Sequence, residues 1–256
     1  MSAAPRILCC EVVCVKLYRR AIVVAVAVLV VAALIRSAVL MGRSVPSSAS
    51  HPILPVIILD PGHGGADGGA EANGLMEKNI NLEIALAMRD MFTASGFDVV
   101  MTREEDVSIH DPGVMGLRKQ KISDLHNRLA IINGHPGAVF ISVHQNKFGQ
   151  KSSHGTQVFF GPQNTESELL ATVMQQRFVR DLQPDNHRLQ KKASKDLFLL
   201  YEAPCAAVLL ECGFLSNARD AAMLSDPEYR GKVAFTAYAA VLEYLDLSAR
   251  DITNEY

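Results

Sequence analysis

Four residues in this chain have side chains that could together hold and use a metal ion: His63, Glu77, His144 and Glu211. His63 lies in the segment 62–65, where glycines on both sides let the backbone turn sharply and leave the imidazole unobstructed. A hydrolytic zinc site takes two or three imidazole or carboxylate ligands and keeps one position open for water. It also needs a nearby carboxylate to move protons. His63, Glu77 and His144 offer the ligands, and Glu211 offers the carboxylate.

Each of these residues also has a simpler interpretation. A histidine between glycines is more often a plain turn residue, and Glu77 fits the first turn of a helix, where the helix dipole favours an acidic side chain. Glu211 could pair with an arginine. It directly follows the apolar run 206–210, however, where an ionised carboxylate is costly without a partner or a task. In a dry cleft its pKa would rise, against the opposing pull of a metal cation. The joint pattern favours a metal site.

The pattern of apolar residues between these four predicts an α/β fold. Strands are predicted at residues 56–59, 97–102, 139–144, 156–160, 197–200 and 206–211. Helices are predicted at residues 77–95, 123–133, 166–181 and 227–245. Because strands alternate with helices, we expect a single domain with a mostly parallel β-sheet flanked by helices. Sites in such sheets lie beyond the carboxyl ends of the strands, which would bring the segments 60–65, 144–147 and 211–217 together.

A different kind of segment precedes this domain. Residues 21–35 are fifteen uninterrupted apolar residues that follow Lys16, Arg19 and Arg20. A membrane-crossing helix needs about 20 apolar residues, a length reached if the segment continues to residue 41 and the charge of Arg36 extends to the interface. We expect residues 21–41 to be a signal anchor. A cleaved signal peptide and a buried core helix are the alternatives.

The basic flank sets the expected domain organisation. It would keep residues 1–20 as a short cytoplasmic N-terminus and send the rest of the chain outside the membrane. Residues 42–54 have the composition of a linker, so the catalytic domain is expected to span residues 55–248.

Composition and cysteine usage set further limits. The net charge of -2, with 20% charged residues, gives no reason to expect a nucleic-acid partner. Cys205 and Cys212 flank the predicted strand 206–211, which would hold them about 20 Å apart, beyond the reach of a disulfide. We expect both to be free, packed thiols.

The motifs around the four residues resemble those of the zinc-dependent N-acetylmuramoyl-L-alanine amidases. The similar stretches include IILDPGHGG at 57–65, ISVHQN at 141–146 and LECGFLSN at 210–217, with shorter ones at 74–78, 101–103, 127–130 and 155–158. The resemblance covers about residues 55–245. It implies that His63, Glu77 and His144 bind Zn²⁺ and that Glu211 is the catalytic carboxylate. It also implies a peptidoglycan substrate, cut at the amide bond between N-acetylmuramic acid and L-alanine.

Residues 144–148 depart from the common family pattern, which often has alanine before the asparagine and a small residue after it. This variant, together with a single N-terminal membrane segment, is similar to the sporulation and germination branch called CwlD. Members of that branch remove peptides from muramic acid in the spore cortex so that muramic lactam can form. The resemblance therefore implies an extracytoplasmic domain, anchored or secreted, at the cell wall or spore envelope, with any accessory protein still to be identified.

Three other functions stay open at this point. They are a vegetative autolysin that separates cells, a non-catalytic wall-binding protein on the same fold, and a zinc peptidase that cuts within the peptide stems. His126 and His154 are competing ligands, but neither stands at a predicted strand end. Four further motif residues either orient substrate or brace the site: Arg103, Arg128, Asn146 and Asn217.

Overall fold

The computed structural model describes residues 22–33, 36 and 54–254. The chain divides into two compact units, Met1–Ile53 and Leu54–Tyr256. Residues 22–33 of the first unit are helical, and no helix within the described residues is both long and apolar enough to cross a membrane. The predicted N-terminus 1–20 lies outside the described residues, as do parts of the predicted anchor 21–41 and nearly all of the predicted linker 42–54.

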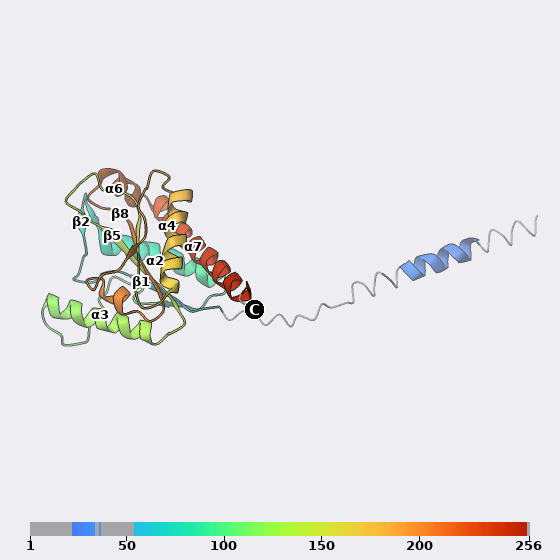
Figure 1. The fold of residues 1–256 in the computed structure, drawn as a ribbon, viewed down its shortest axis with the longest axis horizontal. Coiled ribbons are helices and arrows are strands. Elements are labelled where there is room, and N and C mark those ends of the chain that lie inside the picture. Colours follow the sequence, from blue (N-terminus) through green and yellow to red (C-terminus); the bar gives the residue numbers. More distant parts are fainter. Residues whose placement is uncertain (1–21, 34–35, 37–53, 255–256) are drawn as a thin grey trace, which may run out of the picture. The chain divides into compact units, whose positions relative to one another are not determined.

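A six-stranded sheet forms the centre of the second unit, in the order β4-β1-β5-β8-β6-β7 (Figure 1). The strands are β1 (Ile57–Pro61), β4 (Val99–Met101), β5 (Val139–Asn146), β6 (Gln157–Phe160), β7 (Lys191–Lys192) and β8 (Ala206–Phe214). Neighbouring strands are parallel except for β6 and β8, which are antiparallel. The prediction of a single α/β domain with a mostly parallel sheet is confirmed.

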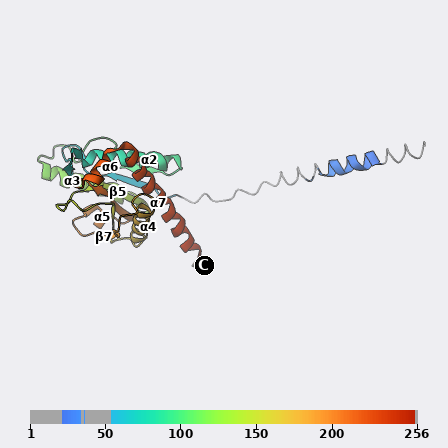
Figure 2. The same ribbon diagram turned by 90° about the horizontal axis from the view of Figure 1, so that it is seen from above.

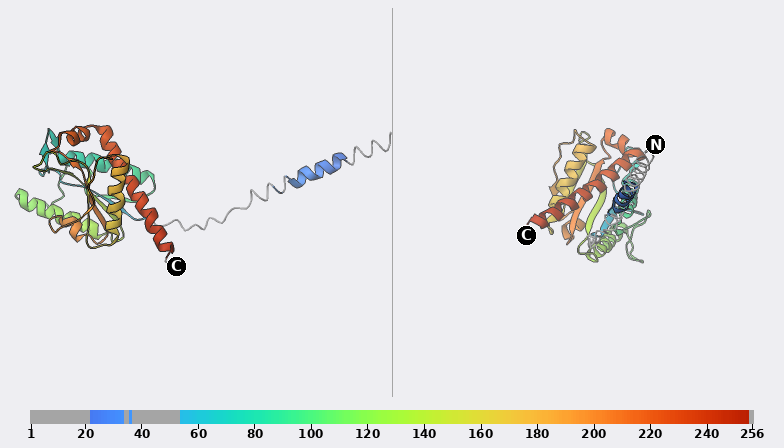
Figure 3. Two further views of the ribbon diagram at one scale, coloured as in Figure 1. Left: turned by 45° about the horizontal axis from the view of Figure 1, so that its top comes forward. Right: turned by 90° about the vertical axis from the view of Figure 1, so that its right-hand side faces the viewer.

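Helices pack on both faces of this sheet. One face is covered by α2 (Glu77–Ala94), α4 (Glu166–Asp181) and α7 (Pro227–Asn254), with α7 lying between the other two (Figures 2 and 3). The opposite face is covered by α3 (Leu117–Asn133) and α5 (Phe198–Glu202). A short helix, α6 (Ala218–Ser225), follows β8.

The central strands are apolar on both sides, which is why they read as continuous apolar runs. In β5, Ile141 and Val143 pack toward α2, α4 and α7, whereas Phe140 packs toward α3 and α5. Each such side chain contributes about 1.5–3 kcal/mol when fully buried. The strands are therefore held rigidly, and the residues at their carboxyl ends are fixed in position with them.

Several predicted elements differ in the structure. Residues 197–200 were predicted as a strand, but the chain forms helix α5, in which Tyr201 and Ala203 donate backbone hydrogen bonds to Leu197 and Leu199. A four-residue apolar run fits a buried strand or one buried side of a short helix equally well. Helix α3 begins at Leu117 instead of Ser123, and α7 continues to Asn254. Cys205 and Cys212 are free and buried, as predicted.

Candidate metal centre and catalytic cleft

The site lies at the carboxyl ends of β1, β5 and β8, which are adjacent parallel strands. Pro61 pairs with Val143, and His144 pairs with Glu211. The turn after β1, which carries His63, therefore lies next to the end of β5. The three segments that the sequence placed at one edge do meet there.

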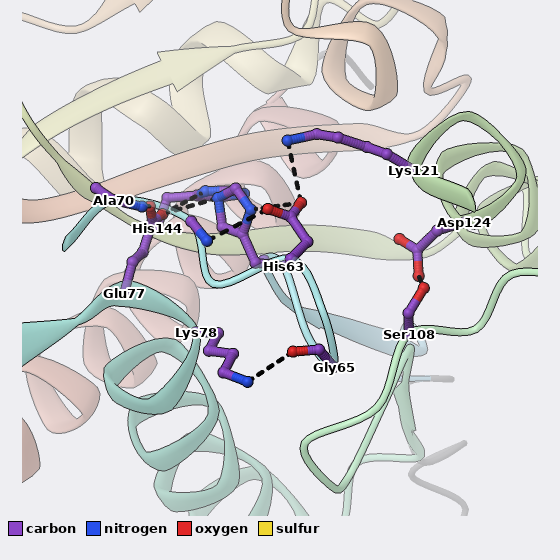
Figure 4. A network of polar contacts seen from close by, with 12 residues as sticks. His63, Gly65, Ala70, Glu77, Lys78, Ser108, Lys121, Asp124 and His144 are labelled. Atoms are coloured by element: carbon purple, nitrogen blue, oxygen red, sulfur yellow. Dashed lines mark hydrogen bonds and ion pairs between the residues drawn. The ribbon is translucent and has the colours of Figure 1, made fainter. Parts of the chain in front are cut away.

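Ligand atoms from His63, Glu77 and His144 all lie within 4.8 Å of one another. Glu77 Oε1 is 3.2 Å from His63 Nε2 and 2.8 Å from His144 Nδ1, and the two rings stand edge to face with centroids 5.0 Å apart (Figure 4). A tetrahedral ion with bonds of about 2.0–2.1 Å separates its ligands by about 3.3 Å. The two separations from Glu77 Oε1, 3.2 and 2.8 Å, are close to that spacing.

Glu77 is the first residue of α2, and a short hairpin brings the chain to it. The hairpin is formed by β2 (Glu71–Ala72) and β3 (Leu75–Met76), neither of which was predicted. Glu77 Oε2 accepts a hydrogen bond from the backbone N–H of Ala70 (2.7 Å), and Oε1 accepts one from that of Gln145 (3.0 Å). Burial raises the pKa of Glu77, but its contacts with the two histidines outweigh this and hold the pKa far below the usual range.

His63 is held in an uncommon backbone conformation, with φ of 64°. Its Nδ1 is 2.9 Å from Asp67 Oδ2, and because a carboxylate only accepts, Nδ1 carries the hydrogen. Nε2 then faces Glu77. Burial lowers the pKa of His63, but hydrogen bonds and charges of Asp67 and Glu77 raise it to about 9. Sequence reasoning missed Asp67. An acidic residue four positions after the histidine in a glycine-rich turn was the available signal.

Two glycines leave the space that the ligands occupy. A Cβ atom at Gly62 would lie 2.2 Å from His144 Cε1. One at Gly69 would lie 2.6 Å from Glu77 Oε2, and the φ of +70° there also disfavours other residues. Both glycines are therefore required for the ligand geometry.

Arg103 and Arg128 brace the turn that carries His63. The Arg103 guanidinium donates to the carbonyls of Pro61 (2.9 Å) and Gly62 (3.1 Å). The Arg128 guanidinium donates to the carbonyls of Pro61 (3.0 Å) and His63 (2.8 Å) and pairs with Asp60 (2.5 Å). Of the two roles left open for these arginines, bracing is the one their contacts show.

Glu211 lies in the carboxyl-terminal half of β8, where it pairs with His144 of β5. Its Oε2 is buried and has no hydrogen-bond partner within the described part of the chain. Burial raises the pKa of Glu211 to about 7, with His144 and His63 lowering it and Glu77 raising it further. A carboxyl group that titrates near neutrality can both take up and release a proton at working pH.

Comparison with known proteins identifies the family. A family model described as N-acetylmuramoyl-L-alanine amidase matches residues 57–243.

The chain belongs to this amidase family.

The amidase is 36% identical over 189 residues to the germination-specific N-acetylmuramoyl-L-alanine amidase of Bacillus subtilis, covering 74% of this chain and 79% of that protein. Its fold is similar to that of the CwlD amidase of Clostridioides difficile, solved in complex with the GerS lipoprotein. The TM-score is 0.73 at 35% identity, covering 76% of this chain and all of the other. The catalytic domain of CwlV from Bacillus (Paenibacillus) polymyxa gives a TM-score of 0.61 at 28% identity. The predictions of an N-acetylmuramoyl-L-alanine amidase acting on peptidoglycan, and of likeness to CwlD, are confirmed.

A cleft of about 170 Å³ opens beside the candidate metal-ligand cluster, on the sheet face covered by α3 and α5. His63 and His144 lie at its polar end, and Phe140, Phe198 and Leu209 are among its apolar lining residues. An extended substrate could therefore place its reacting amide beside the histidines and rest its apolar parts along the sheet.

The remaining predicted residues are not members of the candidate ligand cluster. Asn217 caps α6, accepting from the backbone N–H groups of Arg219 and Asp220. The carbonyl of Asn146 accepts from the backbone N–H of Leu215 (2.8 Å). His126 packs its ring against Phe198, and His154 bonds locally to Ser152. Neither histidine belongs to the metal-ligand group found among the described residues.

Proposed function

We propose that this amidase is a zinc hydrolase in which His63, Glu77 and His144 hold the metal and Glu211 moves protons. The observation that carries the proposal is the convergence of three ligand atoms beside a carboxylate whose Oε2 is buried and unpartnered. Two imidazoles and one carboxylate form a donor set that zinc commonly takes in catalytic sites.

Each group in the site would have its own role in the reaction. Zinc, when bound, would act as a Lewis acid that lowers the pKa of water and polarises the scissile carbonyl. Glu211 Oε2 would take the proton from the attacking water and return it to the departing nitrogen of L-alanine. Asp67 would keep the His63 ring oriented, since its Oδ2 lies 2.9 Å from His63 Nδ1, the nitrogen that faces away from Glu77.

We further propose that the substrate is spore cortex peptidoglycan. Once the peptide stem is removed from its muramic acid, that sugar can form the muramic lactam needed for germination. The relative from Bacillus subtilis is named for germination, which supports this substrate over vegetative wall. The domain organisation proposed with it has a cytoplasmic N-terminus 1–20, a signal anchor 21–41, a linker 42–54 and a catalytic domain 55–248. This arrangement would place the site outside the membrane.

A lipoprotein is proposed as the accessory partner. The CwlD amidase similar to this chain was solved in complex with a lipoprotein. Purification of the full chain from sporulating cells should recover a lipoprotein in stoichiometric amount. Recovery of the chain without one would count against this partner.

Digestion of purified walls tests the function. The full chain should bind one zinc ion and release intact stem peptides, more of them from cortex than from vegetative wall, as read by mass spectrometry of the muropeptides. The His63→Ala variant should lose both zinc and activity. Shortened stems still attached to sugar would indicate a peptidase instead, and equal release from both walls would favour a vegetative autolysin.

A further inference from the structure

Asp67 lies next to the metal-ligand cluster but is not a ligand of it. Its Oδ2 is 2.9 Å from His63 Nδ1 and 3.0 Å from Lys121 Nζ, so one oxygen joins the two residues (Figure 4). Its backbone is fixed as well, by two hydrogen bonds exchanged with Gly64 (3.0 and 3.1 Å). The carboxylate therefore sits on a rigid turn and cannot easily move away from the ring.

Lys121 reaches this carboxylate from α3, a helix that is also tied to the His63 turn by Arg128 and to residues 108–109 by Asp124. Asp124, three residues on, accepts from the backbone N–H of Ile109 (2.7 Å) and pairs with Arg128 (2.6 Å). Arg128, seven residues on, donates to the carbonyl of His63 (2.8 Å). Residues three and seven apart lie on one side of a helix. One side of α3 thus presents three charged side chains to the His63 turn and its neighbours.

Lys121 differs from the other two because it is accessible. Its side chain is 50% exposed, whereas that of Arg128 is 1% exposed. It lines both the cleft beside the ligands and a second hollow next to it, and each of these includes His63 and Asp67. A change at Lys121 should therefore alter its contact with Asp67 without unpacking the core.

We propose that Asp67 is a positioning residue, which holds His63 with Nε2 directed at the metal, and that Lys121 clamps Asp67 from α3. The proposal rests on the zinc function proposed above. A carboxylate bonded to the second nitrogen of a metal-binding histidine fixes the tautomer and the ring orientation and makes the ligand more basic. Lys121 also places a positive charge 3.0 Å from Asp67 Oδ2.

Zinc affinity of the full chain tests the proposal, measured by competition with a chromophoric chelator. Asp67→Ala should weaken zinc binding by about 10–100-fold, the usual effect of losing such a partner. Lys121→Met should weaken it less, and Lys121→Arg should restore most of the loss. Lys119→Met is the matched control, since Lys119 is an exposed lysine of the same helix with no ion pair among the described residues. It should bind zinc as the wild type does.

The urea midpoint of the metal-free chain separates positioning from folding. The Lys121 variants should keep that midpoint while their zinc affinity changes, a result that a merely structural ion pair does not give. Wild-type zinc affinity in both Asp67→Ala and Lys121→Met would overturn the proposal. Failure of the proposed function would look different: the wild-type chain itself would bind no zinc, or would bind it equally well after His63→Ala, and this inference would fall with it.

Discussion

Two clusters of charged side chains lie side by side at the carboxyl edge of the sheet, and they are completed in different ways. In the first, Asp60 accepts from Thr102, Ser142 and Arg128 at 2.5–2.7 Å, and Arg128 also pairs with Asp124. Every charged side chain in that cluster pairs with another residue of the chain. We call it the brace.

The second cluster, His63, Glu77 and His144, converges instead on one oxygen. Glu77 Oε1 is approached by both imidazoles and by the backbone N–H of Gln145, although one carboxylate oxygen offers about two lone pairs. Lys121 pairs with Asp67, whereas no lysine or arginine of the described residues pairs with Glu77 or Glu211. A divalent cation bound here would relieve the crowding and supply the missing counter-charge. The same residue types make a brace where the chain supplies the counter-charges and a binding site where it does not.

Replacing Glu211 with glutamine should have the largest effect. The amide keeps the shape of the side chain but cannot take up a proton, so the rate of peptidoglycan cleavage should fall about 10²–10⁴-fold. Zinc content should not change, because Glu211 is not in the ligand group. Glu202→Gln, at an exposed carboxylate on α5, serves as the control and should retain full activity. Cleavage by Glu211→Gln at the control's rate would remove Glu211 from the mechanism.

Arg128→Met tests whether the brace depends on its internal counter-charges. The change leaves Asp60 and Asp124 without their cation in a buried site, which typically costs about 3–5 kcal/mol. Urea unfolding of the metal-free chain measures the loss. Adding Asp60→Asn to the same chain should recover part of it, because the uncompensated charge is then gone. An unchanged urea midpoint in Arg128→Met would show that the brace does not hold the turn.

Gly69→Ala and Gly74→Ala form a matched pair for the metal cluster. Both glycines have left-handed backbones, with φ of +70° and +75°, so each alanine should cost about 1–2 kcal/mol in strain. Only at Gly69 would the new Cβ lie within 3 Å of Glu77 and His63, whereas nothing lies within 4 Å at Gly74. Zinc affinity should therefore fall in Gly69→Ala and stay unchanged in Gly74→Ala. Equal affinities would mean that the ligands can shift without loss.

The sequence predicted those parts of the fold in which buried residues form a long run or a regular spacing of apolar residues. Helix α4 was placed over its full length, Glu166–Asp181, and the cores of β5 and β8 were found from their continuous apolar runs. Two-residue strands such as β2 and β7 carry no such pattern. Helix α5 was mistaken for a strand because four apolar residues fit both structures.

The residues of the site also divide into those that the sequence marks and those that it does not. His63, Glu77, His144 and Glu211 could be singled out because their types suit metal chemistry and three of them stand at strand ends or beside glycines. Asp67 had only a weak signal, its place four positions after the histidine, since its contact with His63 depends on a turn whose backbone angles the sequence does not specify. Arg103 and Arg128 were found, but their role was open because their acceptors are backbone carbonyls, which every residue has.

The smallest expected effect is on how the free energy of unfolding changes with pH, which should differ between the two clusters. In the metal-free chain the pKa of Glu211 is raised from 4.5 to about 7 and that of His63 from 6.5 to about 9, so the folded chain binds more protons than the unfolded chain over both ranges. Stability should therefore fall as pH rises from about 4.5 to 9, by at most about 1.4 kcal/mol per pH unit for each proton. The brace contributes nothing here, because the pKa of Asp60 is lowered and that of Arg128 is raised, both away from this range.

Urea midpoints measured with a chelator at several pH values test this, with one variant for each half of the range. Glu211→Gln should flatten the decline below pH 7, and His63→Gln should flatten it above, since each removes the group that titrates there. Saturating zinc should reverse the upper part, because metal binding requires a neutral His63 and so strengthens as protons leave. A metal-free chain of constant stability between pH 6.5 and 9 would show that His63 is not held by its two carboxylates, and the contrast with the brace would then rest on geometry alone.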